Sequence, residues 1–205
     1  MTVNPYAPPR SVVADIAPPV EVDVEPPFFA VSVPKLIIMC FCTFTLYEIY
    51  WFYKNWKRIA ERERITISPQ ARGLFAVFYC YQCFARIRDY GVSSADTLSL
   101  QVFWNESQET PVIAGRKLAA VPLAIGWIVT TVVSGIPAPY SLISLFAFLF
   151  LVPVQKHANR VNAIAAPTHD RNARLRGWNW FGIVLGGLFT LIGIAGTILA
   201  PDGGP

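Results

Sequence analysis

The chain has 205 residues, of which 54% are hydrophobic and only 15% are charged, with a formal net charge of +4. Soluble domains carry about 25% charged residues, so this composition excludes an ordinary water-facing globule. The 17 Lys and Arg residues fall between long apolar runs, which is typical of membrane proteins and argues against a nucleic-acid-binding domain.

The first 32 residues are rich in proline, as in "NPYAPPR" and "IAPPVEVDVEPPFF". Proline lacks a backbone donor and restricts the residue before it, so this stretch suits neither a helix nor a central strand. We therefore expect residues 1–32 to be a disordered, extended leader of polyproline character. The leader has no basic start followed by an apolar run, so it does not read as a signal peptide.

Four apolar runs are long enough, or nearly long enough, to cross about 30 Å of hydrocarbon. They predict transmembrane helices over residues 36–53, 118–134, 140–155 and 177–200. A fifth run, over residues 73–85, has only 13 residues, which favours a short interfacial or re-entrant helix. The predicted fold is all-α: an integral membrane bundle over residues 33–200 with four transmembrane helices and one short helix, followed by a tail at 201–205.

The basic residues predict how this bundle is oriented. With four spans and the leader outside, 15 of the 17 Lys and Arg lie in the cytoplasm, whereas the inverted arrangement leaves 2 there. If the run at 73–85 also crossed, the cytoplasmic count would be 6 or 11, depending on orientation. Positive residues near span ends are held in the cytoplasm, so we expect a multi-pass protein of the bacterial inner membrane with a periplasmic N-terminus.

The stretch "YEIYWFYKNWKR" at residues 47–58 changes from aromatic to basic. Amphipathic rings gather where a bilayer meets water, and basic residues lie just beyond them on the cytoplasmic side. The predicted interfacial belt consists of Tyr47, Tyr50, Trp51, Tyr53 and Trp56. The residues predicted to contact anionic lipid are Lys54, Lys57, Arg58, Arg62 and Arg64.

Two of these stretches resemble a group of uncharacterised bacterial inner-membrane proteins, of the domain-of-unknown-function kind. Their leader is similar to "NPYAPPR", and their first helix carries Thr-x-x-x-Tyr-x-x-Tyr-Trp-Phe-Tyr-Lys. The matching residues are Thr43, Tyr47, Tyr50, Trp51, Phe52, Tyr53 and Lys54. Those proteins often have glycine where this chain has Thr45, a departure that weakens the expectation of close helix packing there. "PVQKHANRVN" at 153–162 is similar to the group's polar exit from a later span, and the resemblance implies no known reaction.

Polar side chains within the apolar runs are the candidate functional residues. Glu48 lies inside the first predicted span and suggests a proton or cation site, or a partner for Lys or Arg on another helix. It is also about 9 Å along a helix from Lys54, so it could reach the interface and stay solvated. Gln155, Asn159 and Asn162 share one helical face, where they could line a polar vestibule or form the commoner interhelical hydrogen bonds.

The C-x-x-C pair Cys80 and Cys83 suggests thiol chemistry, but it lies within an apolar run and not at the start of a helix that follows a strand. Buried packing is the commoner role of such thiols. In the last span, Gly182, Gly186 and Thr190 are four residues apart, which favours close helix packing within the bundle and leaves assembly between copies open. No Cys/His spacing predicts a metal site, and no Ser, His and acid grouping predicts a hydrolase.

Taken together, these features predict a non-catalytic accessory or scaffold protein that acts through contacts with helices and with anionic lipid. We expect no enzyme activity, no cofactor and no nucleic acid, and partners drawn from the bilayer, a second copy or other membrane proteins. One alternative is a small transporter or permeation subunit that uses Glu48 with Gln155, Asn159 and Asn162. A second is a membrane thiol-redox protein that uses Cys80 and Cys83.

Overall fold

The computed structural model describes residues 25–102, 118–137 and 140–199, and every regular element in these ranges is a helix. The predicted all-α class is therefore confirmed, while residues 1–24 of the leader and the tail at 201–205 lie outside the described ranges. In chain order the elements are α1 (Val33–Cys42), α2 (Leu46–Glu63), α3 (Pro69–Leu74), α4 (Ala76–Val102), α5 (Ala120–Val132), η1 (Val133–Gly135), η2 (Tyr140–Phe146), α6 (Phe148–Ala165) and α7 (Gly177–Leu199).

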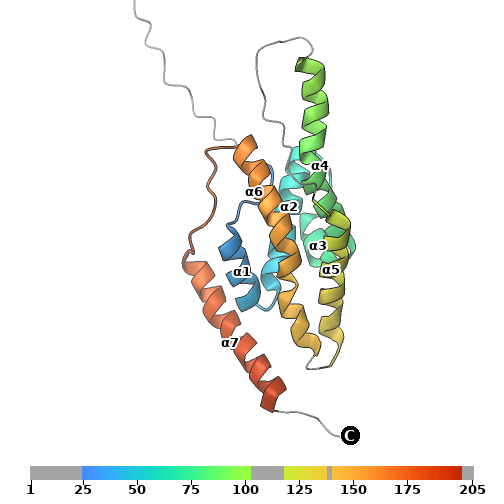
Figure 1. Ribbon diagram of the computed structural model, residues 1–205. Helices are drawn as coiled ribbons and strands as arrows, with labels where there is room; N and C mark the ends of the chain where they lie inside the picture. Colours follow the sequence, from blue (N-terminus) through green and yellow to red (C-terminus); the bar gives the residue numbers. More distant parts are fainter. Residues whose placement is uncertain (1–24, 103–117, 138–139, 200–205) are drawn as a thin grey trace, which may run out of the picture.

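The helices form an elongated bundle in which α5 and α6 are antiparallel neighbours and α7 packs on the outer side of α1 (Figure 1). The core lies where α2, α4 and α5 meet and is built from large aromatic side chains. The Phe52 ring centroid lies 4.8 Å from that of Trp127, 5.0 Å from that of Trp51 and 5.9 Å from that of Phe84. Aromatic rings at these separations bury much apolar area and add specific edge or stacking contacts.

Two helices, Tyr140–Ala165 and Gly177–Gly196, are long and apolar enough to cross a membrane. α7 leaves large apolar side chains uncovered: Trp178 is 85% exposed, Val184 68% and Leu191 67%. A face of this kind is rare on a soluble protein and indicates association with a membrane. The apolar helices Val33–Cys42 and Ala120–Gly135 are shorter, so the structure does not show four complete spans.

The predicted helix over residues 36–53 is wrong as a single element, because α1 ends at Cys42 and α2 begins at Leu46. Phe44 and Thr45 lie between them with φ values of 50° and 66°, in the left-handed region. The Thr43 hydroxyl connects the two helices, since it donates to the Met39 carbonyl at 2.6 Å and accepts from the Tyr47 N–H at 3.1 Å.

This break turns the chain back on itself. In a continuous helix, residues 29 and 55 would lie on the order of 30 Å apart or more. Instead the Phe29 N–H donates to Asn55 Oδ1 at 3.2 Å. With ten residues, α1 is about 15 Å long, which is about half the thickness of the hydrocarbon, so α1 by itself is too short to cross a membrane.

The predicted short helix over residues 73–85 is also corrected. Residues 73 and 74 are the last two of the six-residue α3, and residues 76–85 form the first part of the 27-residue α4. α3 lies close against α2, because a Cβ added to Gly73 would lie 2.9 Å from the Cβ of Tyr53.

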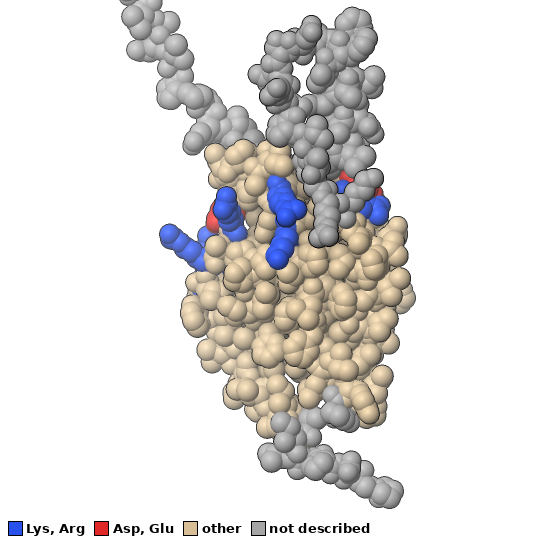
Figure 2. Space-filling model, viewed as in Figure 1, with Lys and Arg blue, Asp and Glu red and all other residues tan. Residues whose placement is uncertain are grey.

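Charged side chains gather at one end of the bundle, and the body below them is uncharged on the face shown in Figure 2. The sequence has the same division, because residues 118–155 and 177–199 contain no Lys, Arg, Asp or Glu. We call this end, which holds the C-terminal parts of α2 and α6 and the loop before α7, the charged end.

Candidate functional site

The predicted face of Gln155, Asn159 and Asn162 exists on α6, and its amides bind the backbone of residues 28–31, just before α1. Asn162 makes two bonds to Phe28, because its Oδ1 accepts from the Phe28 N–H and its Nδ2 donates to the Phe28 carbonyl, both at 3.0 Å. Asn159 Nδ2 donates to the Val31 carbonyl at 2.9 Å, and Gln155 Nε2 donates to the Phe29 carbonyl at 3.1 Å. These three amides form a clamp on the end of the leader.

α2 completes the clamp from the other side. Asn55 accepts from the Phe29 N–H and donates to the Trp51 carbonyl at 3.0 Å. The Trp51 indole N–H donates to Gln155 Oε1 at 2.5 Å. Gln155, Asn162 and Asn55 are each 0% exposed, so the bonds satisfy groups that would be costly to bury alone.

Sequence reasoning did not single out Asn55. A signal for it exists, because Asn55 lies four residues after Trp51 and therefore shares the buried face of α2. The same argument recovers Trp56 and Ile59 as core residues.

Glu48 lies in the first turn of α2 and is only 2% exposed. The expectation that it could reach the interface is therefore wrong, because Glu48 shares the buried face of α2 with Trp51 and Phe52. Its Oε2 accepts from the Trp127 indole N–H at 2.7 Å, while its Oε1 is buried without a hydrogen-bond partner. In the described part of the chain, no hydrogen bond joins Glu48 to the amides of the clamp.

The predicted aromatic belt divides into two groups. Tyr47, Trp51 and Trp56 belong to the core, with exposed fractions of 7%, 0% and 0%, so their assignment to the interface is wrong. Tyr50 is 41% exposed and Tyr53 is half-buried, which suits the interface. The helical repeat explains this division, because side chains three or four residues apart lie on the same face of α2. One such face packs against the bundle, and the side chains between its members face outward.

The predicted basic cluster lies at the charged end, and several of its members are paired within the chain. Arg58 pairs with Glu25, and Lys57 lies 3.8 Å from Glu61. The Arg62 guanidinium lies 4.8 Å from the Phe28 ring centroid and 4.7 Å from that of Tyr90. Lys54 lies over the Tyr50 ring, and Arg64 is exposed at the end of α2.

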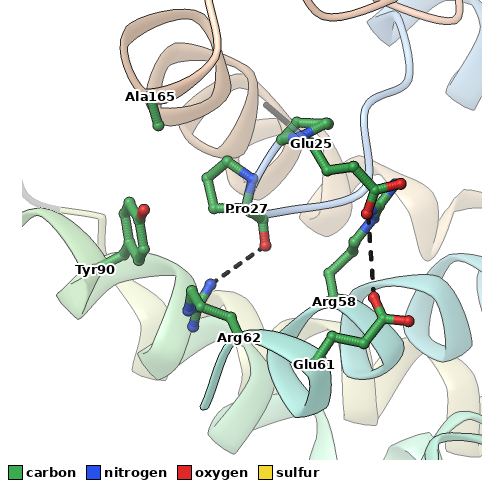
Figure 3. A pocket seen from close by; sticks show the side chains of 8 residues that line it. Glu25, Pro27, Arg58, Glu61, Arg62, Tyr90 and Ala165 are labelled. Carbon is green, nitrogen blue, oxygen red and sulfur yellow. Dashed lines mark hydrogen bonds and ion pairs between the residues drawn. The ribbon is translucent and has the colours of Figure 1, made fainter. Parts of the chain in front are cut away.

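A shallow pocket of about 320 Å³ lies beside Arg58 and Arg62 of this cluster (Figure 3). Arg62 points toward Pro27 and donates to its carbonyl at 3.2 Å, while Glu25 lies over Arg58. The pocket therefore forms where the leader meets α2, which continues the clamp outward to the surface.

Cys80 and Cys83 are free thiols inside α4, and both are 0% exposed. Cys80 Sγ lies 3.8 Å from the Val77 carbonyl, a contact within its own helix. Within residues 25–102, 118–137 and 140–199, no three His, Cys, Asp or Glu side chains are grouped so that they could hold a metal ion.

No family model matches the chain, and neither the curated proteins nor the solved structures contain a match. The resemblance carried by residues 43–54 and 153–162 therefore stays a prediction.

Proposed function

We propose that this chain is a non-catalytic scaffold of the bacterial inner membrane that holds the end of its leader against the charged end of an apolar bundle. The clamp carries this proposal: Gln155, Asn159 and Asn162 are committed to the backbone of residues 28–31. Side chains that bind backbone groups in this way are not available to line a path for a solute. They support a structural role for the polar face.

The proposal includes an orientation that differs from the predicted one. With α5, α6 and α7 crossing the bilayer, the uncharged ranges 118–155 and 177–199 lie in hydrocarbon and the charged end faces the cytoplasm. The α1–α2 hairpin then enters and leaves on the cytoplasmic side as a re-entrant element, in which α6 and α7 cover α1. The ion pair between Glu25 and Arg58 supports an arrangement in which residue 25 lies on the cytoplasmic side.

Side-specific labelling tests this orientation in a cysteine-free background. We expect Ser134→Cys, at the exposed tip opposite the charged end, to react with a membrane-impermeant maleimide in intact spheroplasts. Ser11→Cys in the leader should react only after the membrane is permeabilised. Labelling of Ser11→Cys in intact spheroplasts would instead restore a first helix that crosses the membrane.

A small transporter is the second candidate, and the buried, unpartnered Oε1 of Glu48 is the observation that favours it. Purified protein in liposomes that contain a pH-sensitive dye separates the two proposals. A scaffold should add no proton flux to that of protein-free liposomes. A flux that Glu48→Gln removes, with equal protein incorporated, would favour the transporter.

A further inference from the structure

A second cationic cluster lies on α2, α3 and α4, apart from both the clamp and the pocket. The Arg72 guanidinium lies 4.4 Å from the Trp56 ring centroid and 5.0 Å from that of Tyr79. Arg86 lies 5.3 Å from the same Trp56 ring. We call Trp56, Arg72, Tyr79 and Arg86 the arginine–tryptophan site.

Two hydrogen-bond donors in this site are buried without an acceptor: Trp56 Nε1 and Arg72 Nη1. Trp56 is 0% exposed, so water in bulk does not reach its indole. Arg86 pairs with Glu63 at 3.0 Å, but Arg72 makes no ion pair with any described acid. A buried donor without an acceptor costs about 1–3 kcal/mol, more when it is charged, so an anionic oxygen that pairs with Arg72 would lower the cost of burying this guanidinium.

The surface beside the site is apolar. Leu74 is 64% exposed, Phe75 53%, Phe78 76% and Tyr81 44%, and these residues form the corner between α3 and α4. Leu74 and Phe75 lie two and three residues after Arg72 in the chain. A cation next to exposed hydrocarbon matches a molecule that carries an anionic oxygen and an acyl chain together, as a phospholipid does.

We propose that the arginine–tryptophan site binds the headgroup phosphate of one anionic phospholipid, with an acyl chain against Leu74 and Phe78. Arg72, which is half-buried, supplies the charge, and the Trp56 and Tyr79 rings hold its guanidinium in place by stacking. This inference rests on the proposed membrane location. It names residues other than the predicted lipid contacts at positions 54–64.

Lipid titration of the full chain in neutral detergent tests the site. The probes are dihexanoyl-phosphatidylglycerol, dihexanoyl-phosphatidylcholine and inorganic phosphate, with binding followed by tryptophan fluorescence and by native mass spectrometry. We expect phosphatidylglycerol to bind more tightly than phosphatidylcholine, and inorganic phosphate to compete only weakly. Arg72→Gln should weaken phosphatidylglycerol binding about fivefold. The matched variant Arg171→Gln, which removes one exposed positive charge at the charged end, should change it less than about twofold.

Three results would overturn the site: equal weakening by Arg72→Gln and Arg171→Gln, equal affinity for the two lipids, or competition by inorganic phosphate at the lipid's own concentrations. If Arg72→Gln does not fold, Phe78→Ser tests the apolar half, because that side chain is 76% exposed and contributes little to the core. Phe78→Ser should also weaken phosphatidylglycerol binding, and unchanged binding would count against the site. Carbonate extraction of the same variants shows whether the protein stays in the membrane, so failure of the site is distinguishable from failure of the membrane scaffold.

Discussion

The backbone conformation at Thr45 is left-handed in the hairpin and would be right-handed in a continuous first helix. The relative stability of two substitutions at this position should therefore have opposite signs in the two structures. Thr45 has φ 66°, where an L side chain with a Cβ is disfavoured by roughly 1–2 kcal/mol and glycine is not. Thr45→Ala and Thr45→Gly both remove the hydroxyl and methyl groups, so the difference between them isolates the effect of the Cβ on the backbone.

In the hairpin, Thr45→Gly should be more stable than Thr45→Ala by about 1 kcal/mol, since glycine's larger unfolded-state entropy offsets part of the relieved strain. In a continuous helix over residues 36–53, the order reverses, because glycine is about 1 kcal/mol less favourable than alanine in a helix interior. The stability of Thr45→Gly minus that of Thr45→Ala is therefore expected to differ by roughly 2 kcal/mol between the hairpin and the continuous helix.

Thermal unfolding of the three proteins in one detergent, followed by tryptophan fluorescence, measures this difference. A difference of about 1 kcal/mol corresponds to a Tm shift of roughly 2–4 °C for a chain of this size. We expect Thr45→Gly to have the higher Tm of the two variants. A higher Tm for Thr45→Ala would refute the bend at residues 43–45 and everything inferred from it.

Three further predictions concern the clamp, the packing of α7 and the thiols. Asn162→Leu should lower stability by about 2 kcal/mol or more, because it leaves the Phe28 N–H and carbonyl buried without partners; an unchanged Tm would contradict the clamp. Gly186→Ala should lower stability by about 1–3 kcal/mol, because the added Cβ would lie 2.9 Å from Thr43 Cα. Gly187→Ala is the matched control: its Cβ would meet nothing within 4 Å, so this variant should be as stable as the original protein or more stable. Equal Tm values for the two variants would contradict the close contact between α7 and α1. Cys80 and Cys83 are both 0% exposed, so they should stay unmodified by maleimide in the native protein and react only after denaturation, as followed by mass spectrometry. Rapid labelling of either thiol in the native protein would support the thiol-redox alternative.

The predicted resemblance places a glycine at the position of Thr45. Sequence reasoning connected that glycine with close helix packing, but Thr45 lies at a left-handed turn. The close approach between helices occurs instead at Gly186, which packs against the end of α1. The predicted small-residue face of α7 is therefore confirmed as an intramolecular contact at Gly182 and Gly186, where Met39 and Thr43 lie opposite.

The sequence by itself determined the helical class, the apolar body with its charged end, and the approximate positions of the helices after residue 117. These properties depend on composition and on periodicity within one helix, which are local quantities. The amide face of α6 was also predictable, because its spacing is a property of a single helix.

Only the tertiary structure decided where the chain turns and what the polar side chains bind. The turn at residues 43–45 contains neither glycine nor proline, the residues that usually mark one, so the local pattern favoured a continuous helix. The clamp joins Asn162 to Phe28 across 134 positions of the chain and Gln155 to Phe29 across 126. Such bonds form because buried backbone groups need hydrogen-bond partners, and tertiary packing decides which side chains are close enough to serve. The spacing of residues along a single helix cannot predict these long-range partners.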